Sequence, residues 1–150
     1  MSTISKRTIY VGPAGEDNSK PLNVEGVALA AILPGTLLTQ VATGLEANSK
    51  VHTEFGSELL IADKDQQRSK SVDDAWTVGE NLVAIKGRSG EFLNVLVATG
   101  QAITAKGTAL AHNGSGVLKI SATNGSEQVL AYADEIITTT STQLVRVRVA

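Results

Sequence analysis

The stretch that decides the fold begins at residues 76–100, which read WTVGENLVAIKGRSGEFLNVLVATG. Two aliphatic runs in it, Leu82–Ile85 and Phe92–Val97, are separated by a glycine turn at residues 88–90. Runs of about four to eight such residues, bounded by turn residues, are typical of β-strands. The same pattern continues to Val149, and no candidate catalytic group interrupts it. The sequence therefore predicts a chain that builds a β-sheet surface rather than a reaction centre.

Beyond this stretch the pattern predicts further strands at residues 108–112, 117–122, 127–133 and 143–149. Asn113-Gly114 and Asn124-Gly125 are strong hairpin signals, because both residue types tolerate the positive φ that tight hairpin turns require. Successive strands joined in this way are expected to form a meander. The sequence predicts an all-β fold with at most one or two short helices.

The last predicted strand, residues 143–149, alternates strictly between two faces. Its three valines occupy one face, while Leu144, Arg146 and Arg148 occupy the other. In one interpretation the strand is half-buried and its arginines are solvated. In the other, the two arginines pair with carboxylates of a neighbouring subunit, because a planar guanidinium favours bidentate contacts.

The first half of the chain is less regular. Residues 1–11 are predicted to form an N-terminal arm with a short strand near its end. Residues 12–26 are polar and rich in turn-forming residues, which predicts an exposed loop. Pro34-Gly35 predicts a tight turn, because proline presets φ and glycine accepts a positive φ at the next position.

Short strands are expected at residues 36–43 and 59–62. Residues 27–33 form an apolar run that would accept a helical turn. Residues 63–75 are almost devoid of apolar side chains, so they predict an exposed loop, with a short exposed helix as the alternative. The whole chain of 150 residues is long enough for one domain with its own core.

The composition narrows the classes of partner. The chain has 13 basic and 15 acidic residues, a net charge of −2, which predicts neither a nucleic-acid partner nor binding to an anionic membrane. Only 3% of the residues are aromatic, so the core should consist of Val, Ile, Leu and Ala. The longest apolar stretch is interrupted by charged, glycine and proline residues, and it does not predict a membrane-spanning helix.

The histidines are the first candidates for catalysis or metal binding. His52 is followed by Glu54 two positions later, which on a strand places both side chains on one face. His112 has no acidic residue near it in the sequence, and no cysteine is present to complete a zinc site. A lone base does not make a catalytic centre. The sequence therefore predicts no catalytic, cofactor-binding or metal-ligating residue.

Acidic pairs occur at Asp63/Asp65, Asp73-Asp74 and Asp134-Glu135. A calcium loop needs alternating oxygen ligands, a central glycine and a closing glutamate, and none of these segments has that order. We interpret them as solvated loop charges. The sequence also lacks the spacing of a nucleophile elbow or a phosphate loop.

Several phrases of the second half resemble the head decoration, or cement, proteins of tailed bacteriophages. The phrases are WTVGENL at 76–82, VLVATGQAI at 95–103, KGTAL at 106–110, NGSGVL at 113–118, VLAYADE at 129–135 and the closing VRVRV at 145–149. The resemblance implies a compact β-sandwich or barrel that binds the outer face of a capsid and stabilises contacts between major capsid protein subunits. It also implies a virion location, synthesis in the host cytoplasm, and self-association as a dimer or trimer.

Under this resemblance the N-terminal arm is the natural contact with a partner. Its apolar residues Ile4, Ile9 and Tyr10 could add a strand to a partner's sheet edge, while Lys6 and Arg7 meet an acidic surface. Together with Arg146 and Arg148 they form the expected capsid or oligomer interface. Two alternatives stay open: a β-rich tail, fibre or glycan-binding attachment module, and a small β-barrel enzyme that uses His52 and Glu54.

Overall fold

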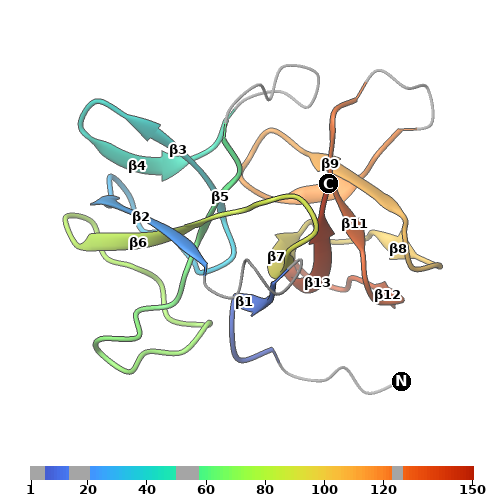
Figure 1. Ribbon diagram of the computed structural model, residues 1–150, viewed down its shortest axis with the longest axis horizontal. Coiled ribbons are helices and arrows are strands. Elements are labelled where there is room, and N and C mark those ends of the chain that lie inside the picture. The colour runs from blue at the N-terminus through green and yellow to red at the C-terminus, as the bar shows by residue number, and fades with distance from the viewer. Residues whose placement is uncertain (1–5, 14–20, 50–57, 123–126) are drawn as a thin grey trace.

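The computed structural model describes residues 6–13, 21–49, 58–122 and 127–150 (Figure 1). These residues form strands, bridges and turns and no helix, so the predicted all-β class is confirmed. Accordingly, no helix in these ranges could cross a membrane. The strands are β1 (Tyr10–Gly12), β2 (Leu22–Val27), β3 (Leu37–Val41), β4 (Gly44–Ala47), β5 (Leu60–Ala62), β6 (Asn81–Lys86), β7 (Phe92–Val97), β8 (Ala102–Ile103), β9 (Ala109–His112), β10 (Leu118–Ile120), β11 (Val129–Ala133), β12 (Ile137–Thr138) and β13 (Gln143–Val149).

Five of the strands close into a small barrel, in the order β7, β10, β9, β11, β13. The barrel closes because β13 pairs back onto β7, from Gln143 opposite Val97 to Arg148 opposite Phe92. β1 pairs with the start of β7, so the end of the N-terminal arm belongs to the same sheet. A closed barrel leaves few free strand edges.

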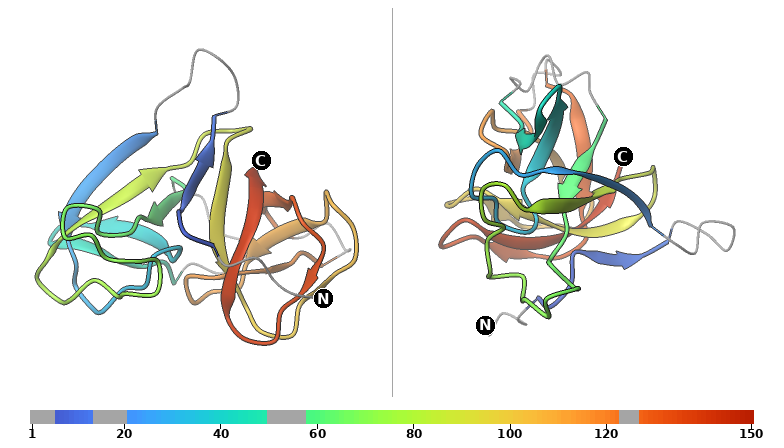
Figure 2. Two further views of the ribbon diagram at one scale, coloured as in Figure 1. Left: turned by 90° about the horizontal axis from the view of Figure 1, so that it is seen from below. Right: turned by 90° about the vertical axis from the view of Figure 1, so that its left-hand side faces the viewer.

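The other large sheet has the order β2, β6, β5, β3, β4 and lies beside the barrel (Figures 1 and 2). Its two outer strands approach each other through a bridge between Ala28 and Leu45, where the Leu29 N–H donates to the Leu45 carbonyl at 3.0 Å. We call this unit the second sheet. Apart from that bridge, the outer edge of β2 is not paired with another strand of the described residues.

Two hydrophobic cores share one wall. Alternate residues of β3, β5 and β6 point in opposite directions, as the period of two in a strand requires. Leu37, Ile61 and Ile85 are buried in the barrel core, whereas their neighbours face a second core that contains Trp76. Those neighbours are Leu38, Leu60, Ala62, Leu82 and Ala84. Burial on both faces explains why these strands read as continuous apolar runs.

The predicted turn at Pro34-Gly35 is confirmed, and it joins the two units. Gly35 has φ +91°, and the Thr36 N–H donates to the Leu33 carbonyl at 3.2 Å. The Gly35 N–H donates to the Ala62 carbonyl of the second sheet at 2.8 Å, while its own carbonyl accepts the Leu96 N–H of the barrel at 3.0 Å. One peptide segment therefore bonds to both sheets.

The prediction of an exposed loop at 12–26 is wrong for its last part, which is strand β2. Residues 22–27 pair with β6 along their full length, from Leu22 opposite Lys86 to Val27 opposite Asn81. β2 is mostly exposed, and its apolar residues Leu22, Val24 and Val27 do not keep the strict alternation by which half-buried strands are recognised. Gly26 interrupts the pattern further, because a Cβ there would lie 2.9 Å from Leu45 Cγ.

The predicted meander is partly wrong. Asn113-Gly114 does connect antiparallel neighbours, β9 and β10, and Asn113 Oδ1 accepts the Ser115 N–H at 2.8 Å. Asn124-Gly125 lies outside the described residues, but β10 and β11 on either side of it are not neighbours. Instead β9 lies between them and pairs along both of its edges, which the closed barrel requires.

The loop at 63–75 is confirmed as non-helical, but it is not simply exposed. Asp63, Asp65 and Val72 are each less than a tenth exposed. The Asp63 N–H donates to the Val83 carbonyl at 3.0 Å, which ties the start of the loop to β6. The interpretation of Asp63 and Asp65 as solvated charges is therefore wrong.

Candidate interaction surface

The residues predicted to contact a partner come from the two ends of the chain. Ile4 lies outside the described residues, as do His52 and Glu54 of the alternative enzymatic hypothesis. The remaining predicted contacts lie on the arm, on β1 and on β13. The structure brings these segments together, although more than 130 residues separate them in sequence.

An ion-pair network joins the arm to β13. The Lys6 Nζ lies 2.9 Å from both oxygens of the Glu135 carboxylate, and Oε1 of that carboxylate also accepts the Arg146 N–H at 2.8 Å. Arg146 Nε donates to Asp134 Oδ2 at 2.7 Å, and its Nη2 donates to the Asp134 carbonyl at 2.9 Å. Asp134 and Glu135 are thus paired rather than solvated. Arg146 already has carboxylate partners in its own chain.

Asn94 of β7 bonds to the arm through both its side chain and its backbone. Asn94 Nδ2 donates to the Thr8 carbonyl at 2.7 Å, and the Asn94 N–H donates to the Ile9 carbonyl at the same distance. Ile9 is fully buried in the barrel core. The expectation that Ile9 reaches a partner is therefore corrected: its apolar side chain completes the core of its own chain.

Tyr10 lies against the turn that precedes β7. There Glu91 is fully buried and accepts hydrogen bonds from Arg88 N at 2.7 Å and Arg88 Nη2 at 3.0 Å. Burial acts to raise the pKa of the Glu91 carboxyl, but the bonds from Arg88 outweigh it and hold the pKa below its usual value. Burial and the nearby Glu91 carboxylate raise the pKa of Tyr10. This cluster anchors β1 and leaves Tyr10 half-buried.

Arg148 is the exposed end of the C-terminal strand. Its Cζ lies 5.0 Å from the centroid of the Tyr132 ring, a cation–π distance. Cross-strand pairing places Phe92 directly opposite Arg148 on the same outer face. Arg7 is also exposed, and its carbonyl accepts a hydrogen bond from Lys64 Nζ at 2.9 Å.

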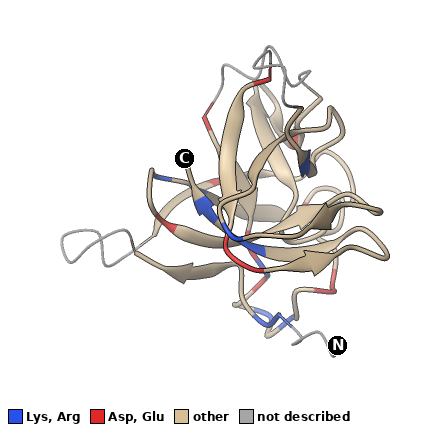
Figure 3. Cartoon of the chain, turned by 90° about the vertical axis from the view of Figure 1, so that its right-hand side faces the viewer, with Lys and Arg blue, Asp and Glu red and all other residues tan. Residues whose placement is uncertain are grey.

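We define the arm–β13 surface as the residues around this network. Lys and Arg residues lie along the C-terminal strand and at the start of the described chain (Figure 3). Its members are Lys6, Arg7, Lys64, Tyr132, Asp134, Glu135, Arg146 and Arg148. Five cations against two carboxylates leave an excess of three positive charges, in a chain whose net charge is −2. The surface is thus locally basic, and it suits a partner with exposed carboxylates.

A groove of about 550 Å³ adjoins this surface at Lys6. Its apolar lining comes from both units, because Leu33 and Pro34 precede β3 while Leu96 and Leu144 belong to the barrel. Leu33 is 45% exposed. The groove thus extends the surface with a mixed lining, in which Asp73, Ser141, Thr142 and Gln143 lie beside the apolar side chains.

His112 has a structural role. It is fully buried, and its Nε2 accepts the Gly116 N–H at 2.9 Å, which fixes the loop after β9. Within the described ranges, no three His, Cys, Asp or Glu side chains gather as a metal site would require. Sequence reasoning missed Lys64, Asp134 and Glu135 as parts of the surface, and it missed Asn94 as the residue that bonds to the arm, since only the fold brings them there.

The sequence matches no protein-family model, and a search of the curated proteins finds no match either.

Proposed function

We propose that this chain is a non-enzymatic structural protein of a tailed-bacteriophage virion. It binds the outer face of the capsid, contacts the major capsid protein and stabilises the contacts between capsid subunits. The arm–β13 surface is the part of the molecule that makes this contact. Dimers or trimers of the chain on the shell would repeat the contact, so that many weak interfaces add up.

The observation that carries the proposal is the meeting of both chain ends on one basic, exposed surface. The Lys6–Glu135 and Arg146–Asp134 pairs hold this surface in one arrangement before any partner binds. A preorganised surface loses less conformational freedom on binding than a mobile one. The resemblance of the second half to decoration proteins then supplies the partner class.

Charge complementarity indicates which side of the partner is involved. Arg7 and Arg148 are exposed and form no ion pair within the described chain. Both guanidinium groups are therefore available to carboxylates on an acidic face of a capsid subunit. Contacts of this kind weaken as the salt concentration rises.

The test is binding of the purified full chain to expanded phage capsids that lack it, measured by co-sedimentation and by cryo-electron microscopy. We expect saturable binding in a fixed ratio to the capsid subunit, with density on the outer face. The double variant Arg7→Gln/Arg148→Gln should bind about tenfold more weakly, since two exposed charge pairs contribute about 1.4 kcal/mol in total. Failure to bind any such capsid, or density in the tail alone, contradicts the proposal.

Lys86→Gln is the matched control. It removes one exposed positive charge from β6, and its only ion pair in the described chain joins it to the exposed Glu58. We expect its capsid affinity to stay unchanged. An equal loss of affinity in Lys86→Gln would mean that net charge rather than the arm–β13 surface governs binding. Deletion of residues 2–5 tests the arm separately, because it leaves Ile9 in the core.

A further inference from the structure

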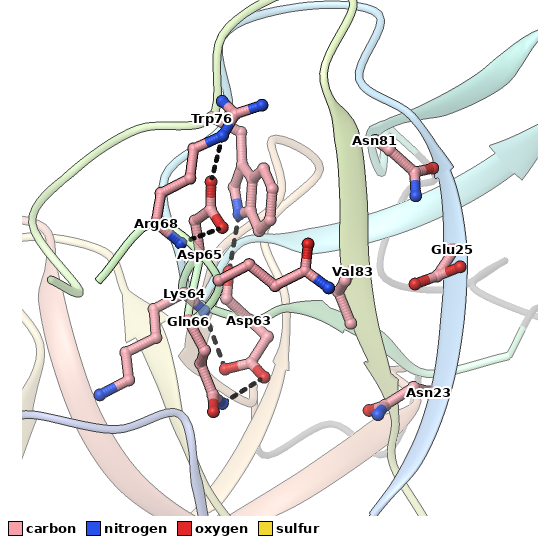
Figure 4. A pocket seen from close by; sticks show the side chains of 11 residues that line it. Asn23, Glu25, Asp63, Lys64, Asp65, Gln66, Arg68, Trp76, Asn81 and Val83 are labelled. Atoms are coloured by element: carbon pink, nitrogen blue, oxygen red, sulfur yellow. Dashed lines mark hydrogen bonds and ion pairs between the residues drawn. The ribbon is translucent and has the colours of Figure 1, made fainter. Parts of the chain in front are cut away.

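A second recess borders the arm–β13 surface at Lys64 and lies between the start of the 63–75 loop and the strands β2 and β6 (Figure 4). Its volume is about 340 Å³, at the lower end of the range for small-ligand sites. Nine of its eleven lining residues are polar or charged. They are Asn23, Glu25, Asp63, Lys64, Asp65, Gln66, Gln67, Arg68 and Asn81, and the other two are Trp76 and Val83. We call it the polar pocket.

The floor of the polar pocket follows from the register of β2 and β6. Asn81, Val83 and Ile85 share one face of β6, and Ile85 is buried in the barrel core. Asn81, at the other end of β6, lies outside the barrel core, so this face of the strand is exposed there. Glu25 pairs with Val83 across the strands and lies on the same face. The floor therefore carries polar side chains where the same strand carries apolar ones nearer the barrel.

The wall of the pocket is fixed by hydrogen bonds within the loop. Asp63 accepts the Lys64 N–H at 2.8 Å and Gln66 Nε2 at 3.2 Å. Asp65 accepts the Arg68 N–H at 3.3 Å, and its carboxylate lies 3.6 Å from Arg68 Nε. Trp76 Nε1 donates to the Asp63 carbonyl at 2.7 Å. Figure 4 shows this bonded wall facing Asn23, Glu25 and Asn81 across the recess.

The side chains of the floor are exposed and not yet used. The side chains of Asn23, Glu25 and Asn81 form no hydrogen bond or ion pair with other described residues. Two carboxamides and a carboxylate offer both donors and acceptors within one recess. A rigid wall opposite free polar side chains is the arrangement expected of a site that selects ligands by hydrogen bonding.

The chemistry of the lining selects one class of ligand. A hard cation needs several free oxygens, yet the Asp63 and Asp65 carboxylates are already bonded to Lys64, Gln66 and Arg68. An anion would meet three carboxylates, while the cations of the lining are already engaged, Lys64 with the Arg7 carbonyl and Arg68 with Asp65 and Glu80. An apolar ligand would find only Trp76 and Val83. A neutral ligand with many hydroxyl groups fits, because each hydroxyl both donates and accepts.

We propose that the polar pocket binds a saccharide unit. Its hydroxyl groups would contact Asn23, Glu25 and Asn81 and the polar groups of the 63–75 loop that line the pocket. The pocket is small, so it takes a single unit or a short end of a larger glycan. This assignment goes beyond capsid binding and does not depend on it. Trp76 is almost completely buried and offers no stacking face, so affinity rests on hydrogen bonds and is weak.

The test uses the only tryptophan of the chain as a local reporter. The purified full chain is titrated with glucose, galactose, mannose, N-acetylglucosamine and their common disaccharides. Trp76 fluorescence and the indole Nε1–H resonance in a ¹H–¹⁵N spectrum are followed. At least one probe should give a saturable change, with a Kd near 1 mM, which is the range of a few net hydrogen bonds. No saturable change with any probe in either measurement overturns the proposal.

Variants locate the binding. Glu25→Ala and Asn81→Ala remove exposed side chains of the floor, and each should weaken binding about fivefold or more. Glu46→Ala on β4 removes a carboxylate outside the pocket and should bind as the parent does. Equal binding by Glu25→Ala, Asn81→Ala and the parent would also overturn the proposal, since the saccharide would then bind elsewhere.

A second experiment distinguishes two sources of such a ligand, a cell-surface glycan and a small soluble saccharide. Retention of the protein on immobilised bacterial surface polysaccharide, and release by the free sugar, indicates a glycan of a cell surface. Saturation by free sugars without retention indicates a small soluble saccharide, and both outcomes support the pocket. Capsid binding by Glu25→Ala is measured in parallel, so that loss of sugar binding is distinguished from failure of the proposed capsid function.

Discussion

The barrel and the second sheet reach their stability in different ways. The barrel is closed by the long pairing of β7 with β13, whereas among the described residues the edges of the second sheet meet only through the bridge between Ala28 and Leu45. The barrel core also borrows Leu37, Ile61 and Ile85 from the second sheet. The barrel strands contribute no side chain to the second core. The two units therefore differ in closure but form one folding unit through their shared wall.

The two units also differ in the candidate binding surfaces that they carry. The barrel carries the arm and the ion pairs of the arm–β13 surface, which lie over a closed, filled core. The second sheet carries the exposed strand β2 and, with the 63–75 loop, the polar pocket. It has exposed apolar residues as well, among them Leu22 and Val27 on β2 and Val78 in the turn before β6. The more open unit thus keeps more strand surface available to ligands.

The largest effect is expected where the two units are joined. Gly35→Ala places a Cβ against Leu144 and 3.3 Å from the Leu96 backbone nitrogen, at a φ that L-residues rarely adopt. We expect a loss of about 4 kcal/mol in the free energy of unfolding, because the turn cannot relax without breaking bonds to both sheets. Urea unfolding followed by circular dichroism measures it.

Gly79→Ala is the matched control for this substitution. Gly79 has nearly the same φ, +90°, but a Cβ there would meet no atom within 4 Å. It should cost about 1 kcal/mol, the intrinsic penalty of the left-handed conformation. If both substitutions cost the same, the junction at Gly35 contributes nothing beyond its backbone conformation.

The next effect tests whether two cores make one unit. Leu110→Ala in the barrel core and Leu82→Ala in the second core each remove a fully buried side chain, and each should cost about 3 kcal/mol. Trp76 fluorescence reports on the second core, while far-ultraviolet circular dichroism reports on all strands. Because β3, β5 and β6 border both cores, the two probes should give coincident transitions in both variants. A fluorescence transition that shifts alone in Leu82→Ala would show that the second sheet unfolds separately.

The barrel strands could be predicted from the sequence better than the strands of the second sheet, because the inner faces of the barrel strands are buried. Strands β7, β9, β11 and β13 have an apolar inner face and turn residues between them, so local patterning identifies them. β2 is an exposed strand with Gly26 at a close approach to Leu45, and nothing local distinguishes it from a loop. The order of the barrel strands could not be predicted from the sequence either, because closure of the barrel decides which strand edges pair.

The candidate surface could be assembled from the sequence only in part. Charge and alternation point to Lys6, Arg7, Arg146 and Arg148. The pairing of Glu135 with Lys6 and of Asp134 with Arg146 has no local signal, so both acidic residues read as solvated. Ile9 was assigned to a partner because an apolar residue on an arm resembles an exposed anchor. Its burial depends on Asn94 holding the arm on β7, a contact across 85 residues that no local pattern reveals.

Acid should affect the two units in opposite directions. Glu91 beside the barrel has a lowered pKa in the folded chain, so its stabilising effect is present above the unfolded value of 4.5 and is lost as the pH falls below it. Burial raises the pKa of Asp63, in the loop beside the second sheet, so this residue destabilises the fold at neutral pH and the cost disappears on acidification.

Substitutions at these two residues separate the effects. Glu91→Gln should lose about 2 kcal/mol at neutral pH and show a flatter decline between about pH 6 and pH 3, because it no longer loses the Arg88 pair on protonation. Asp63→Asn should show a steeper decline than the parent over the same range. Urea midpoints measured at each pH give both slopes. Parallel slopes in all three proteins would contradict the assignment of opposite signs.

The smallest effect concerns the exposed end of the barrel. Arg148→Gln removes the contact with Tyr132 but leaves the buried face of β13 intact, so it should change the free energy of unfolding by about 0.5 kcal/mol. Arg146→Gln should cost more, about 1 kcal/mol, since Arg146 bonds to both the side chain and the carbonyl of Asp134. Thermal unfolding at low and high salt measures both. This ranking should reverse in capsid affinity, where Arg148→Gln weakens binding more, because Arg146 is already paired within its own chain while Arg148 is free to meet a partner's carboxylate.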